Sequence, residues 1–162
     1  MIGRPAVRRR RELFERIAKG RGGAAASLLD PMVLAQAQSR MDELKPLAVA
    51  EVQVAIDHIR AMVEQGTGID QVFLAAHDIR GLAGAYGFSG AGVVAGAIRA
   101  YGENLPKDFQ PDWGLLRLLT QMLARTFEHP HAAAPETLAA TCRAAVAKVM
   151  TREGREFPDG DL

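Results

Sequence analysis

Apolar residues recur at spacings of three and four along almost the whole sequence, which is the periodicity of amphipathic α-helices. The clearest stripe is formed by Ala48, Val52, Ala55, Ile59 and Met62. No segment stands out by alternating polar and β-branched residues, as a half-buried β-strand does. The pattern therefore predicts an all-α fold.

Capping residues, prolines and glycines divide this pattern into separate helices. A first helix is expected from Asp30-Pro31 to about Leu44, with Pro46 interrupting it or beginning the next one. The next helix is expected to run to about Gln65, and the one after it from a cap at Asp70 to about Tyr86. A further helix is expected from a cap at Ser89 to about Leu105. The last two are expected from Pro111-Asp112 to Pro130 and from Pro135-Glu136 to about Arg152. Because short connections favour antiparallel neighbours, we expect an antiparallel up-down four-helix bundle over residues 47–128, with one flanking helix on either side.

The charges separate a basic arm from a mildly acidic body. Residues 1–23 carry eight basic and two acidic side chains, a net charge of +6, whereas the remaining residues carry twelve and seventeen, a net charge of −5. We therefore divide the chain into a basic arm and linker (1–27), a helical bundle (28–152) and a polar, loosely held tail (153–162). The arm, with a short amphipathic helix over 7–19, can contact nucleic acid, anionic lipid or an acidic partner, although a solvated extension is the simpler interpretation.

Several classes of protein are excluded by composition. No apolar run reaches the roughly 20 residues that span a bilayer, and no apolar stretch follows the basic N-terminus as in a secretory signal. Cys142 is the only cysteine, which excludes an internal disulfide framework and a multi-cysteine zinc site. His129 and His131 lack further ligands, so we expect no metal site. These features favour a reducing, cytoplasmic setting.

One segment, AHDIRGLAGAYGF over residues 76–88, carries candidate chemistry. On a helical projection Val72, Ala76, Ile79 and Ala83 share the core face, together with Tyr86. The residues expected on a second, exposed face are His77, Gly81, Gly84 and Phe88, bordered by Leu74, with Arg80 near its other edge.

Two glycines beside an exposed histidine need an explanation, because each glycine inside a helix costs about 1 kcal/mol relative to alanine. Since they lie on the histidine face and not on the core face, they indicate that another molecule must approach there. Imidazole is a good nucleophile near neutral pH, and the guanidinium of Arg80 suits phosphate oxygens. A lone helical histidine is usually incidental, so only the joint pattern supports a phosphoryl carrier.

The run resembles the motif of the histidine-containing phosphotransfer (HPt) family, which reads His-x-x-Lys/Arg-Gly with a further glycine ten positions after the histidine. Here these positions are His77, Arg80, Gly81 and Gly87, and the resemblance covers about residues 40–128. It departs from the family in having Arg80 where lysine is commoner, and in a next helix that is rich in glycine.

The resemblance implies a monomeric bundle without an ATP site: a phosphotransfer intermediate of bacterial two-component signalling, and not an autonomous kinase. His77 would be phosphorylated at Nε2, in exchange with the aspartate of a response-regulator receiver domain or a hybrid histidine kinase. The partner, not this chain, would hold Mg²⁺, and this chain would bind no cofactor. Arg80 would contact the phosphate, Gly87 would be a structural motif residue, and Leu74, Gly81, Gly84, Ala85 and Phe88 would form the docking patch.

Other functions stay open at this point. The same fold could serve as a phosphorylation-incompetent adaptor that binds a receiver domain, although such a protein need not keep the nucleophile. The dimerisation and phosphotransfer part of a sensor kinase fits Asp78, but the proline expected soon after it is missing until Pro106. Nucleic-acid binding would depend on the basic arm alone, and we do not expect it.

Overall fold

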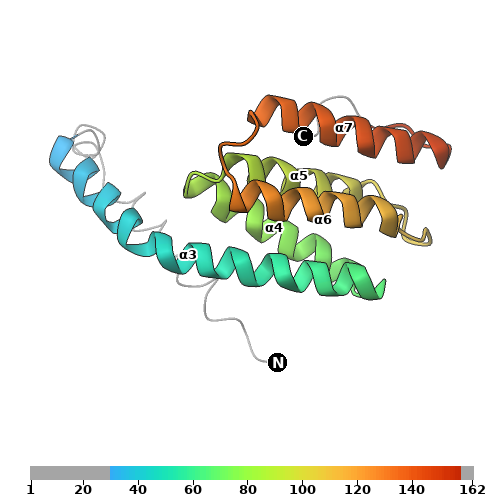
Figure 1. Cartoon of the computed structure of the whole chain (residues 1–162), viewed down its shortest axis with the longest axis horizontal. Helices are drawn as coiled ribbons and strands as arrows, with labels where there is room; N and C mark the ends of the chain where they lie inside the picture. Colours follow the sequence, from blue (N-terminus) through green and yellow to red (C-terminus); the bar gives the residue numbers. More distant parts are fainter. Residues whose placement is uncertain (1–29, 158–162) are drawn as a thin grey trace, which may run out of the picture. The chain divides into compact units, whose positions relative to one another are not determined.

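The computed structural model describes residues 30–157, and every element assigned in that range is an α-helix. The helices, labelled as in Figure 1, are α3 (Pro31–Gln65), α4 (Ile69–Ala85), α5 (Ser89–Glu103), α6 (Trp113–Glu128) and α7 (Pro135–Arg152). This confirms the all-α fold. The predicted helix over 7–19, the basic arm and the last residues of the tail lie outside the described part of the chain.

Helix α3 does not end at Leu44 as expected, but runs through Pro46. A proline inside a helix removes one backbone hydrogen bond and costs about 3 kcal/mol. Pro46 is exposed, so water can satisfy the carbonyl that loses its partner. The start of α3 was predicted correctly, since the Asp30 carboxylate accepts a hydrogen bond from the Met32 backbone N–H at 2.8 Å. The chain nevertheless divides into two units between Leu44 and Lys45, within this helix.

In the second unit, α5 lies between other helices and contacts α4, α6 and α7 (Figure 1). Its residues are buried almost all round, including Val94, Ile98 and Tyr101. The core that surrounds them also contains the apolar stripe of α3 from Val52 onward and the inner faces of α4, α6 and α7. Cys142 on α7 also belongs to this core. The arrangement fixes α4 with one face inward and the opposite face free.

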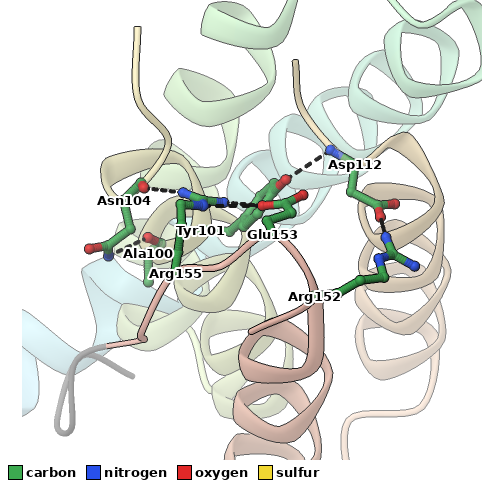
Figure 2. Close-up of polar contacts among 7 residues, drawn as sticks. All are labelled: Ala100, Tyr101, Asn104, Asp112, Arg152, Glu153 and Arg155. Atoms are coloured by element: carbon green, nitrogen blue, oxygen red, sulfur yellow. Dashed lines mark hydrogen bonds and ion pairs between the residues drawn. The ribbon is translucent and has the colours of Figure 1, made fainter. Parts of the chain in front are cut away.

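The beginning of the C-terminal tail is held in place, contrary to the expectation of a loose segment. Arg155 donates hydrogen bonds to the carbonyl of Asn104 and to the carboxylate of Glu153 (Figure 2). Its guanidinium carbon also lies 6.0 Å from the ring centre of Tyr101 and 5.1 Å from that of Phe109. The residues after α7 therefore close the end of the fold where α5 finishes.

The same cluster positions the start of α6. The phenol oxygen of Tyr101 accepts a hydrogen bond from the backbone N–H of Asp112 at 2.8 Å (Figure 2). The Asp112 carboxylate caps α6 through the backbone N–H of Leu115 and also pairs with Arg152. Among the described helices, none combines the length and apolar character needed to cross a membrane.

Candidate functional site

The candidate site lies on α4, and backbone geometry at both helix ends fixes its extent. Gly68 precedes the helix with a φ of 67°, and Asp70, expected as the cap, makes no capping bond from that position. After the helix, Gly87 adopts a φ of 86°. The backbone N–H of Phe88 then reaches back to the carbonyl of Ala83 at 2.9 Å, which satisfies an otherwise unpaired end of the helix. Gly87 therefore ends the helix in a backbone conformation in which other residues are strained.

Within α4 the inner and outer faces are those that the helical projection predicted, whereas Tyr86, assigned to the core face, follows the helix and is only half-buried. Val72, Ala76, Ile79 and Ala83 are fully buried in the core. His77 is exposed on the opposite side. The imidazole is thus held by a helix whose other face is anchored, and it remains accessible to a visiting molecule.

The two glycines beside His77 have no packing role inside the described structure. A methyl group built on either Gly81 or Gly84 would meet no atom within 4 Å. Both positions are exposed. The helix surface next to the imidazole therefore carries no side chain at these two positions. Packing among the described residues does not require glycine at either of them.

Arg80 lies at the boundary between α4 and α5. A methyl group built on Gly96 of α5 would lie 3.3 Å from Nη1 and 3.5 Å from Cδ of Arg80, so the arginine side chain extends across that glycine. Gly92 faces the α4 backbone, where a methyl group would make ordinary contacts at 3.8 Å with the Arg80 carbonyl oxygen and the Gly84 nitrogen. The closest approach is at Gly102, where a methyl group would lie 2.5 Å from the ring of Phe73, so the glycines of α5 allow close packing against α4.

The remaining residues of the predicted docking patch do not share one exposed surface. Leu74 is 62% exposed, a large value for a leucine, and Ala85 is exposed at the end of α4. Phe88 does not share this face, because α4 ends before it. Its ring instead packs 4.8 Å from that of Phe127 in the core. The helical projection was wrong for Phe88 because it assumed that the helix continued through Gly87.

One ion pair on α5 was not predicted by the sequence interpretation. Arg99 of α5 pairs with Glu103, with Nε at 2.8 Å and Nη2 at 2.6 Å from the same carboxylate oxygen. The sequence shows both residues, and it also shows the glycines around them.

No metal centre is evident at this site. No group of three or more histidine, cysteine, aspartate or glutamate side chains that could hold a metal ion occurs within residues 30–157. His58, His129 and His131 are exposed, and the last two flank Pro130 just after α6. The chemistry available on α4 is therefore that of an accessible imidazole, a neighbouring guanidinium and an open helix surface.

Comparison of the chain with models of protein families, with curated proteins and with solved structures finds no match.

Proposed function

We propose that this chain is a histidine phosphotransfer protein that accepts a phosphoryl group on His77 from a receiver-domain aspartyl phosphate and passes it to another receiver. One observation carries the proposal: an exposed imidazole lies beside two glycines, Gly81 and Gly84, at which an added side chain would meet nothing. A helix that gives up about 1 kcal/mol at each glycine without any internal packing gain is best explained by the approach of another molecule.

The helix arrangement supports this proposal. In the proposed architecture, the later part of α3 together with α4, α5 and α6 would form an antiparallel four-helix bundle, with α7 packed against α5. Such a bundle holds His77 rigidly on one helix, which suits a group that must be presented in one orientation to a partner. The protein would act as a monomer in the cytoplasm.

The proposed transfer needs only groups that the two proteins supply. The lone pair of Nε2 of His77 attacks phosphorus in line with the aspartyl oxygen. The N–P bond forms as the P–O bond breaks, and the electron pair of the P–O bond leaves with the aspartate carboxylate. The ring keeps its proton on Nδ1, so the phosphorylated imidazole carries a positive charge that offsets part of the phosphoryl charge. The partner's Mg²⁺ and active-site groups would stabilise the equatorial oxygens.

Arg80 supplies the nearest cation that the α4 sequence offers. Its guanidinium lies at the edge of the same surface, where it crosses Gly96. Within the described residues no carboxylate pairs with Arg80, so its charge is available to an incoming phosphoryl group. Leu74 and Ala85 provide apolar surface on either side along the helix.

The test is phosphotransfer from a panel of phosphorylated receiver domains in the presence of Mg²⁺. We expect rapid labelling of this chain by at least one receiver, with the acid-labile and alkali-stable behaviour of phosphohistidine. His77→Gln should abolish labelling, whereas His58→Gln, which alters another exposed histidine, should leave it unchanged. Labelling that persists in His77→Gln would refute the assigned site.

A second variant tests why glycine occupies the helix surface beside His77. Gly84→Gln adds a flexible side chain to a position where nothing inside the fold obstructs it. We expect the variant to fold normally but to lose most transfer from the receiver. If a receiver binds the wild-type chain tightly and never transfers phosphate, the chain is an adaptor of the same fold, and the proposed activity is wrong.

A further inference from the structure

The first part of α3 exposes an apolar stripe formed by Val33, Leu34, Ala37, Met41 and Leu44. The four large side chains of this stripe are between 38% and 52% exposed. At their spacings of three and four, the five residues fall within a sector of about 100° around the helix, the width of the apolar face of an amphipathic helix. Seven of the ten large hydrophobic side chains that are exposed among the described residues belong to α3, so the exposed apolar surface is concentrated on this helix.

The same face of α3 is buried further along the helix. Leu34, Met41 and Ala48 follow one another at intervals of seven residues, which keeps them on one side of the helix. Ala48 and Val52 are buried in the core, whereas the stripe residues before them are exposed. An apolar face that continues in register for two heptads beyond the buried part is typical of a contact surface.

Charged residues around the stripe are separated by sign. On the helical projection Arg40 borders the stripe, whereas Asp42 and Glu43 lie on the opposite side of α3. All three side chains are exposed. The carboxylate of Asp42 accepts a hydrogen bond from the amide of Gln38 at 3.0 Å, also away from the stripe. An apolar stripe with a cation at its edge and the carboxylates turned away from it fits a negatively charged surface.

The chain just before α3 supplies further positive charge. Residues 1–23 carry eight basic and two acidic side chains, a net charge of +6. Residues 31–44 of α3 carry one basic and two acidic side chains, so they cannot neutralise the arm. An anionic lipid surface attracts a cluster of basic side chains and accepts an apolar helix face laid along its interface. Stable anchoring takes two such signals, and this segment supplies both.

We propose that the apolar stripe of α3 and the basic arm together bind the surface of an anionic lipid membrane. The stripe enters the boundary between headgroups and acyl chains, and the arginines of the arm contact the headgroups. The helix lies along the surface and does not cross the bilayer. A second copy of the chain is a poorer partner, because two stripes of about three turns bury less than the roughly 1,200 Å² at which stable interfaces begin. The inference is independent of the chemistry proposed for His77.

The experiment sediments the full chain with vesicles of phosphatidylglycerol and phosphatidylcholine, or with phosphatidylcholine vesicles alone. We expect binding to the mixed vesicles to be at least about tenfold tighter and to weaken as salt is added, because salt screens the charges. Leu34→Gln combined with Met41→Gln should weaken binding to the mixed vesicles about tenfold, since two apolar side chains no longer enter the interface. Replacing residues 8–11, four arginines, by glutamine should weaken it by a similar factor and reduce the salt dependence.

The matched control is Val54→Gln combined with Leu118→Gln, which alters two apolar side chains, 69% and 46% exposed, outside the stripe. This variant should bind the mixed vesicles as wild type does. If the variant at Leu34 and Met41 also binds as wild type, or if wild type does not distinguish the two kinds of vesicle, the inference is wrong. It is also wrong if light scattering without lipid shows a dimer that this variant lacks, because the stripe then pairs with a second copy. Circular dichroism shows whether each variant is folded.

Discussion

The side chain of Arg80 extends across Gly96, at a distance where a methyl group on that glycine would lie 3.3 Å from Nη1. This relationship joins the helix that carries His77 to the glycine-rich helix beside it. It also explains why the arginine remains near the imidazole, since α5 offers it a surface without side chains. The position of the cation thus depends on a residue of another helix.

Gly96→Ala should therefore alter phosphotransfer through Arg80. The added methyl group displaces the guanidinium by a few tenths of an ångström or more, and we expect a reduced transfer rate with little change in thermal stability. Stability should change little because Arg80 is exposed and can move, while alanine favours the helix. Transfer kinetics and melting temperature, measured on the same preparation, check this. An unchanged transfer rate would show that the placement of Arg80 on Gly96 has no functional role.

Gly81 and Gly87 provide a matched comparison, because an added methyl group meets nothing at either position. Gly81 lies inside α4 with ordinary helical geometry, so Gly81→Ala should raise the free energy of unfolding by up to about 1 kcal/mol. Gly87 has a φ of 86°, so Gly87→Ala should lower the free energy of unfolding by about 1–2 kcal/mol. Urea denaturation of both variants measures the difference. Equal shifts for both would contradict the assigned role of Gly87 at the end of the helix.

Arg155 should stabilise the fold more than its place near the C-terminus suggests. It bonds the Asn104 carbonyl and the Glu153 carboxylate (Figure 2). Its guanidinium also lies over the ring of Phe109. We expect Arg155→Ala to lower the free energy of unfolding by about 1–3 kcal/mol, because charge-assisted hydrogen bonds and the ring contact are lost together. The control is Arg152→Ala, whose side chain is 68% exposed and whose pair with Asp112 should contribute less than about 1 kcal/mol. If both variants lose a similarly small free energy of unfolding, the contacts of Arg155 do not hold the tail in place in solution.

Because the thiol of Cys142 is buried, the free energy of unfolding should fall at alkaline pH. Burial raises the pKa of its thiol from 9.0 to about 11, because the charged thiolate is poorly solvated in the core. The stabilisation from keeping the thiol neutral is fully present below about pH 9 and is lost as the pH rises toward about 11. Burial also raises the pKa of Tyr101, so Cys142→Ala should remove only part of the decline. Urea midpoints across this pH range measure it, and rapid alkylation of the native thiol would contradict the burial of Cys142.

The sequence determined the local structure of the candidate site. The spacing of Val72, Ala76, Ile79 and Ala83 identified the buried face of α4, and therefore placed His77 on the exposed one. This succeeded because helical periodicity depends only on neighbouring residues. The same reasoning failed at Pro46, which was expected to interrupt the helix or begin a new one but lies within a continuous helix. It also failed at Phe88, which was placed on the face of α4 but follows a turn at Gly87.

Only the tertiary structure decided what lies beside the imidazole. The alignment of α4 with α5 results from the packing of Arg80 on Gly96 and of Phe73 on Gly102, residues that are distant in sequence. No local pattern could have shown that alignment. The contact of Arg155 with Asn104 at the end of α5 has the same origin. Register between helices depends on which side chains fit together in space, whereas the sequence alone records only their order.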